Sequence, residues 1–168
     1  NYFLGHLPML LHPGDPKTVL HICFGVGNSL SAVAAHSSLE RVDNLELSPH
    51  VLDAAQYFWT NNGVLEHPKV RTIIDDGRNY LAAPDEIYDV TMLEPPETFT
   101  AGVINLYPRE FYESAREHLA ADGLLMQWVP TGEAPLDQER MLFRAFADVF
   151  PHATVWSQGG TGVMLIIG

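Results

Sequence analysis

The sequence predicts an α/β fold: a mostly parallel, seven-stranded sheet with helices on both faces, ending in an antiparallel hairpin. Three observations lead to this prediction. Short apolar runs alternate with longer helical patterns through most of the 168 residues. A glycine-rich turn joins the first run to the first helical pattern, as is typical of open parallel sheets. The last two runs are joined by a link too short for a parallel crossover.

Seven strands are predicted, at residues 18–24, 41–47, 70–74, 87–93, 124–129, 153–157 and 163–167. Helical patterns occupy residues 29–36, 49–59, 78–82, 108–121 and 135–150. Because β–α–β connections are right-handed, this alternation places helices on both faces of the sheet. The length suits one domain, so residues 1–168 are expected to form a single unit.

Local signals support three of these boundaries. Ser48-Pro49 is typical of an N-cap followed by proline in the first helical position. Asp122-Gly123 is expected to end the helix that begins at Pro108. The link Gly159-Gly160-Thr161-Gly162 is expected to close the hairpin. A parallel sheet that ends in one antiparallel hairpin is the arrangement of Rossmann-like methyltransferase folds.

Composition excludes several classes of protein. Apolar residues make up 46% of the chain and charged residues 18%, which is enough to form a core. The net charge of −12 opposes binding to nucleic acid or to an anionic membrane, and favours a cationic substrate. Cys23 is the only cysteine, so no intrachain disulfide is expected and a cytoplasmic, reducing location is the simpler expectation. The chain starts at Asn1 rather than Met, which suggests an excised or trimmed piece.

Two apolar stretches share some features with membrane or targeting segments. Residues 18–39 carry no formal charge, but their pattern is that of a strand, a turn and a helix. Residues 1–11 contain His6 and Pro8 and lack the basic start and cleavage pattern of a signal peptide. Neither stretch is therefore expected to span a membrane or to act as a leader.

The first turn and the second strand together predict a nucleoside site. Gly25-Val26-Gly27 lies where a ligand could approach a helix start, although a tight turn alone would also need glycine. Glu46 follows Gly27 by 19 residues and ends the second strand, where a carboxylate can accept both ribose hydroxyls. A solvated strand-end carboxylate is the alternative. Leu30 replaces the third glycine that a dinucleotide would need, which favours a single nucleoside.

Carboxylates also follow the third and fourth strands, at the edge where open α/β sheets bind ligands. Asp76, in Asp75-Asp76-Gly77, could accept from an adenine amino group, cap the helix at 78–82, or do both. Glu94 and Glu97 flank two prolines, so this pair could be held rigidly for a cation. The alternative is a pair of solvated loop carboxylates.

The sequence argues against several other chemistries. No two histidines are three or four residues apart, so a metal site on one local element is not expected. Gly27-Asn28-Ser29-Leu30-Ser31 resembles a nucleophile elbow, but it follows the first strand, which argues against a hydrolase. Cys23 lies in a buried-type strand and is expected to be core. Three aromatic residues at helical spacing are also expected to be core: Phe143, Phe146 and Phe150.

The chain resembles the polyamine aminopropyltransferases, such as spermidine synthase, and especially a bacterial branch in which that domain follows a membrane region. The likeness runs nearly end to end. It rests on Gly5-His6-Leu7-Pro8 with His12-Pro13, and on residues 19–27, 42–48, 75–81, 88–97, 106–112 and 122–129.

This resemblance implies a role for each candidate residue. Glu46 would bind the ribose, and Asp76-Gly77 would contact adenine. Glu94 would orient and deprotonate the attacking amine, and Glu97 would hold the other ammonium of the substrate. The family usually has an acid where this chain has Val26, and Asp-Ser-Ser-Asp in place of residues 94–97. The family's N-terminal β-rich segment has no counterpart in this sequence.

The resemblance therefore predicts aminopropyl transfer from decarboxylated S-adenosylmethionine to a di- or polyamine. Either that compound or S-adenosylmethionine would be a cosubstrate, with no permanently bound cofactor and no metal. The expected partners are a small-molecule nucleoside and a polyamine, while a homodimer and an upstream membrane region are left open. Two alternatives also stay open: a non-catalytic nucleoside-binding or interaction domain of the same fold, and an S-adenosylmethionine-dependent methyltransferase.

Overall fold

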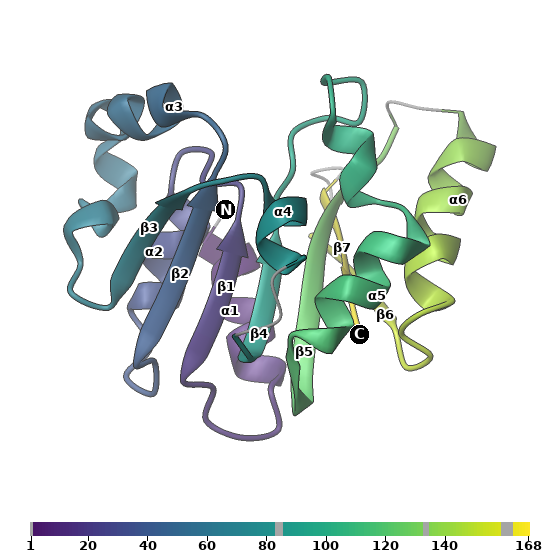
Figure 1. Ribbon diagram of the computed structural model, residues 1–168, viewed down its shortest axis with the longest axis horizontal. Coiled ribbons are helices and arrows are strands. Elements are labelled where there is room, and N and C mark those ends of the chain that lie inside the picture. The colour runs from purple at the N-terminus through teal and green to yellow at the C-terminus, as the bar shows by residue number, and fades with distance from the viewer. Residues whose placement is uncertain (1, 83–85, 133–134, 159–162) are drawn as a thin grey trace.

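A computed structural model describes residues 2–82, 86–132, 135–158 and 163–168, and within them a single seven-stranded sheet has the order β3-β2-β1-β4-β5-β7-β6 (Figure 1). The strands are β1 Thr18–Ile22, β2 Arg41–Glu46, β3 Val70–Ile74, β4 Tyr88–Leu93, β5 Leu119–Pro130, β6 Thr154–Gln158 and β7 Val163–Ile167. β1 to β5 pair in parallel, and β7 pairs antiparallel with both β5 and β6. The predicted sheet is confirmed, whereas the glycine-rich link at 159–162 lies outside the described residues.

Helices cover both faces of the sheet, as predicted. They are α1 Tyr2–Leu11, α2 Asn28–Ala34, α3 Pro49–Ala54, α4 Gly77–Leu81, α5 Arg109–Glu117 and α6 Leu136–Ala147. In Figure 1, α4 and α5 lie in front of the sheet, and α1 and α2 lie behind it. Among the helices of the described residues, none is both long and apolar enough to cross a bilayer.

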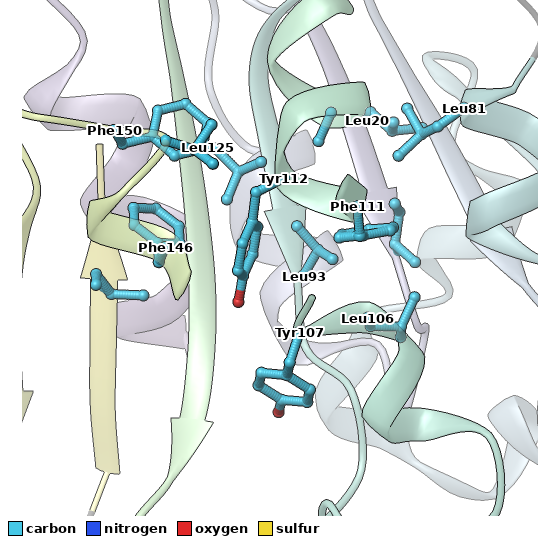
Figure 2. Close-up of a cluster of buried hydrophobic side chains, with 14 of the residues drawn as sticks. Leu20, Leu81, Leu93, Leu106, Tyr107, Phe111, Tyr112, Leu125, Phe146 and Phe150 are labelled. Carbon is cyan, nitrogen blue, oxygen red and sulfur yellow. The ribbon is translucent and has the colours of Figure 1, made fainter. Parts of the chain in front are cut away.

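The front face holds an aromatic core between the sheet and helices α4, α5 and α6. Figure 2 shows Tyr112 between Phe146 on one side and Leu93 and Phe111 on the other. The rings of Tyr112 and Phe146 meet edge to face with centroids 5.1 Å apart, a favoured aromatic geometry. Phe146 and Phe150 are buried in this cluster and Phe143 packs against it, so their predicted core role is confirmed.

The rear face is built around a helix that the sequence did not predict. α1 contains Pro8, which lacks a backbone donor, but its buried face packs on α2 and compensates for the lost hydrogen bond. The contact is close because Gly5 has no side chain: a Cβ there would lie 2.3 Å from the Ser29 carbonyl oxygen. His6 Nδ1 also meets His36 Nε2 at 3.0 Å beyond the end of α2.

The helix predicted at residues 49–59 is shorter than expected. α3 ends at Ala54 and continues as 3-10 turns at Ala55–Tyr57 and Trp59–Asn61, because the Asn61 side chain donates to the Ala55 carbonyl at 2.8 Å. Further short 3-10 turns occupy Val64–Glu66 and Val103–Leu106.

The prediction that Asp122-Gly123 ends a helix was wrong. α5 ends at Glu117, where His118 Nδ1 lies 2.9 Å from the Ser114 carbonyl oxygen and caps the last turn. β5 then begins at Leu119 with an irregularity, because two residues along β4 correspond to five along β5. Asp122-Gly123 lies in that irregular stretch of the strand.

A buried carboxylate on β2 links side chains from β3 and β4. Asp43 on β2 is fully buried and accepts from Arg71 on β3 at 2.7 and 2.9 Å. It also accepts from the Tyr88 hydroxyl on β4 at 2.7 Å, and that hydroxyl lies 2.7 Å from the Tyr80 hydroxyl. Burial, followed by these hydrogen bonds, raises the pKa of Tyr88 far above its ordinary value. Tyr88 therefore stays neutral and serves as a donor to the carboxylate.

Candidate active site at the carboxyl edge of the sheet

The sheet order brings the predicted site residues to one edge. β3, β2, β1 and β4 are neighbours with parallel direction, so the segments that follow them leave the same side of the sheet. The order reverses between β1 and β4, which is where ligands bind in open α/β sheets. Glu46 ends β2, and Asp76, Gly25-Val26-Gly27 and Glu94 follow β3, β1 and β4.

A cavity of about 260 Å³ lies at this switch point. The glycine turn and Glu94 contribute to its wall, together with Leu4 of α1 and Trp128 of β5. Sequence reasoning missed both of these apolar residues, because α1 was not predicted and Trp128 is distant in sequence. The cavity thus combines one carboxylate with apolar walls, a composition suited to a cationic ligand with a hydrocarbon chain.

The two glycines of the turn have different roles. Gly27 has a φ of 83°, and a Cβ on it would lie 2.5 Å from the Phe24 ring. Gly25 also has a positive φ, and a Cβ there would meet nothing within 4 Å. The turn therefore needs glycine at position 27 for packing, and leaves the backbone at position 25 open to a ligand.

The Glu46 carboxylate is held by the backbone on both sides. Its Oε2 accepts from the Phe24 amide and its Oε1 from the Ser48 amide, each at 2.9 Å. Glu46 is only 8% exposed, so the alternative of a solvated strand-end carboxylate was wrong. Each oxygen keeps a second lone pair, so the fixed carboxylate can still accept hydroxyl hydrogens.

Asp76 is the N-cap of α4, which confirms one of its two predicted roles. Its Oδ1 accepts from the Arg78 amide at 2.9 Å, and its Oδ2 accepts from the Arg78 guanidinium at 2.6 Å. The guanidinium hydrogen bonds lower the pKa of the Asp76 carboxyl. Gly77 is buried against Ile22, where a Cβ would lie 3.0 Å away. The adenine contact of this pair stays a prediction.

The pKa of the Cys23 thiol reflects the negative charge around the switch point. Burial raises its pKa to about 12, and the carboxylates of Glu46, Glu94 and Asp76 add to the effect in that order. Three carboxylates predicted for the site therefore act on one atom at the end of β1. The thiol stays protonated at neutral pH, which argues against a nucleophilic role.

The structure brings Glu94 into the cavity but not Glu97. The Glu94 amide donates to the Ile22 carbonyl at 3.1 Å, which fixes the residue beside β1. Its side chain is 15% exposed. Glu97 lies beyond Pro96 and is half-buried, but it is not part of the cavity wall. The two carboxylates were expected to act as a rigid pair, so the role of Glu97 stays a prediction.

A second group missed by sequence reasoning is a polar cluster beneath Glu94. His21 is fully buried, with Nδ1 3.1 Å from Asn44 Oδ1 and Nε2 3.2 Å from Ser29 Oγ. Its Nε2 also lies 3.7 Å from Glu94 Oε1. Within the described ranges, no group of three or more histidine, cysteine, aspartate or glutamate side chains is arranged to hold a metal ion.

The mostly parallel sheet, the terminal hairpin and the ligand cavity at the switch point define a domain of the methyltransferase type of Rossmann fold. The chain belongs to the spermine/spermidine synthase family, because residues 2–147 match the sequence pattern of the spermine/spermidine synthase domain.

Curated relatives of this chain are named as polyamine aminopropyltransferases. The protein from Methanocaldococcus jannaschii is 32% identical over 134 residues, covering 79% of this chain and 44% of the relative. Polyamine aminopropyltransferase 1 of Pseudomonas aeruginosa is 32% identical over 139 residues, covering 82% and 48%. The chain thus spans about half the length of these relatives.

Solved structures show the same fold. Spermidine synthase from Thermotoga maritima aligns over 99% of this chain and 57% of its own, with a TM-score of 0.83 and 26% identity. A spermidine synthase in complex with the transition-state analogue AdoDATO aligns with a TM-score of 0.85 and 26% identity, covering 99% and 58%. Human methyltransferase-like protein 13 shares the fold at 18% identity, with a TM-score of 0.77 and 98% and 74% coverage.

Proposed function

We propose that this chain forms the nucleoside-binding part of an aminopropyltransferase, which transfers an aminopropyl group from decarboxylated S-adenosylmethionine to a di- or polyamine. The observation that carries the proposal is the position of Glu94, whose carboxylate lines the cavity beside the glycine turn. The relatives named as polyamine aminopropyltransferases and the neighbour that holds AdoDATO support the same reaction.

The proposed reaction is a direct displacement. A neutral amine attacks the carbon next to the sulfonium, so a C–N bond forms while the C–S bond breaks and the thioether leaves uncharged. An alkyl ammonium has a pKa of about 10.4 by analogy with lysine, so it must lose a proton before attack. In the proposed mechanism Glu94, which lines the cavity, would take that proton, and the remaining task of the site is to align the reactants.

The nucleoside would lie across the ends of β1, β2 and β3. Glu46 would accept the two ribose hydroxyls with its free lone pairs, and Asp76-Gly77 would contact the adenine. Because Asp76 is already bonded to Arg78, an adenine amino group would share an oxygen with the guanidinium. This arrangement leaves the cavity wall of Val26 and Glu94 for the charged tail of the donor.

Replacing Glu46 with glutamine should weaken binding of methylthioadenosine by about tenfold or more, because charge-assisted bonds to both hydroxyls are lost. Isothermal titration calorimetry measures this affinity. Glu40→Gln is the matched control, since Glu40 forms an exposed ion pair with Lys17. Thermal unfolding of the same variants checks that the turn held by Glu46 is still formed. Parent-like affinity in folded Glu46→Gln would refute the ribose assignment.

Val26 should make the site tolerant of a donor carboxylate. The side chain is 36% exposed and lines the cavity, where the family resemblance implies an acid. A valine neither attracts an ammonium nor repels a carboxylate, so decarboxylated S-adenosylmethionine should be preferred over S-adenosylmethionine by less than about tenfold. Val26→Asp should restore the preference, chiefly by weakening the carboxylated ligand. Titration of both ligands into both proteins measures this, and a hundredfold preference in the parent would contradict it.

Two observations favour a second candidate, a non-catalytic nucleoside-binding domain of the same fold. Val26 supplies no charge to the donor tail, and Glu97 lies outside the cavity wall. Calorimetry with methylthioadenosine, S-adenosylmethionine, its decarboxylated form and NAD shows which of these ligands binds. Together with activity assays it distinguishes an aminopropyltransferase, a non-catalytic domain and a methyltransferase. Binding of the nucleosides without turnover supports the non-catalytic domain, and methyl transfer from S-adenosylmethionine supports a methyltransferase.

A further inference from the structure

A histidine lies directly behind the proposed base. His21 is the fourth of the five residues of the buried strand β1, where it is fully inaccessible to solvent. Glu94 Oε1 is buried and makes no hydrogen bond, and it lies 3.7 Å from His21 Nε2. This distance is too long for a hydrogen bond, but a small side-chain rotation would close it.

The strand register explains why these groups meet. His21 pairs with Asn44 on β2 and with Met92 on β4, and Glu94 follows the last residue of β4, two residues beyond Met92. Side chains two residues apart in a strand point to the same face, and diagonal neighbours are within reach of long side chains. The imidazole therefore lies between Asn44 and Glu94 on the rear face of the sheet.

The orientation of the Asn44 amide, which turns its oxygen toward the ring, assigns the tautomer of His21. Asn44 Oδ1 can only accept, so His21 Nδ1 carries the hydrogen of the 3.1 Å bond. Nε2 is then the basic nitrogen, and the Ser29 hydroxyl can donate to it at 3.2 Å. A basic nitrogen thus faces the inner oxygen of the carboxylate whose proposed task is to remove a proton.

We infer that His21 is a positioning residue of the proposed transferase: it takes up the proton that Glu94 removes from the amine, and then holds Glu94 Oε1 by donating that hydrogen to it. The inference rests on the proposed function. Glu94 first takes the ammonium proton and becomes a carboxylic acid. The Ser29 hydroxyl rotates and gives up its hydrogen bond to His21 Nε2, and the proton passes to that nitrogen, which leaves an imidazolium hydrogen-bonded to a regenerated carboxylate. After the product leaves, the same proton returns through Glu94 to solvent.

The other groups around His21 do not compete for this proton. Ser29 of α2 and Asn44 of β2 are neutral, and both are buried. Glu94, directly after β4, is the charged side chain that lies against the imidazole within the described residues. Glu46, the next acid on this edge, is bonded to the backbone amides of Phe24 and Ser48 instead.

The kinetic test replaces His21 with glutamine, which can still bond Asn44 but cannot hold a proton. With 1,4-diaminobutane as the amine, we expect kcat at pH 7.5 to fall about tenfold, while the KM for the diamine and the affinity for methylthioadenosine change less than about twofold. At pH 9.5 the deficit should shrink to about twofold, because more of the amine is already neutral. An equal deficit at both pH values would show a merely structural role and overturn the inference. His152→Gln removes an exposed histidine and is the matched control.

The spectroscopic test does not depend on turnover. In protein with ¹⁵N-labelled histidine, adding methylthioadenosine and 1,4-diaminobutane should protonate His21 Nε2 in the parent and leave it unprotonated in Glu94→Gln. If calorimetry shows that the diamine binds but the imidazole signal does not change, the inference is overturned and the proposed function stands. If the diamine neither binds nor reacts, the proposed function fails, and the role of His21 fails with it.

Discussion

Replacing Glu94 with glutamine is expected to lower turnover by about two orders of magnitude or more, while the affinity for methylthioadenosine stays nearly unchanged. Glu94 lies in the cavity, where it would act on the amine, whereas the proposed ribose contact is made by Glu46 at the end of β2. Loss of the base should therefore affect kcat rather than nucleoside binding. Steady-state kinetics with decarboxylated S-adenosylmethionine, together with calorimetry, measure the two effects separately.

Two further variants make this experiment specific. Glu113→Gln makes the same chemical change at an exposed ion pair with Arg109 and should keep parent activity. Glu97→Gln should mainly raise the apparent KM for the diamine, because this residue is proposed to hold the second ammonium. Equal turnover in the parent and in Glu94→Gln would place the non-catalytic domain ahead of the transferase.

Replacing Asp43 with alanine is expected to lower the free energy of unfolding by about 3 kcal/mol. The change leaves Arg71 and the buried Tyr88 hydroxyl without their shared acceptor. Arg71 is half-exposed and can recover some hydration, so we expect the lower end of the range for a broken buried pair. Urea denaturation followed by circular dichroism measures this loss.

The matched control for Asp43 is Asp137→Ala, which removes an aspartate from an exposed pair with Arg140. Its urea midpoint should equal that of the parent, because exposed ion pairs contribute little to the free energy of unfolding. If Asp43→Ala also unfolded at the parent's midpoint, the buried network would have no net stabilising role.

The sheet could be predicted from the sequence because its strands are short apolar runs separated by clear turn and helix signals. β3 and β7 occupy the predicted residues, and the N-caps at Ser48 and Asp76 lie where the local signals placed them. These features depend on a few adjacent residues. Local chemistry therefore determines them without knowledge of the tertiary structure.

The errors arose where packing outweighs local signals. α1 forms despite Pro8 because it packs closely on α2 through Gly5. The start of β5 lies within a pattern that favours a helix, but pairing of Leu119 with Tyr88 extends the sheet there. Tertiary contacts between distant residues decide both cases, and a single sequence does not display them.

The candidate site was predictable in part, for the same reason. Glu46, Asp76 and Glu94 could be placed because each lies at or just beyond the end of a strand in a parallel sheet. His21 could not be singled out as a partner of Glu94, because their contact depends on the register of β1 against β4. Trp128 could not be predicted as part of the cavity wall, because its place there depends on the pairing of β5 with β4.

The most direct test of the proposed transferase is a product assay on the protein with decarboxylated S-adenosylmethionine and 1,4-diaminobutane. Chromatography with mass spectrometry would follow methylthioadenosine and the aminopropylated amine. Direct displacement predicts that the two products appear in equal amounts, and that neither appears at a comparable rate in Glu94→Gln. Tight binding of methylthioadenosine without formation of either product would contradict the proposed transfer and leave a nucleoside-binding domain without catalysis.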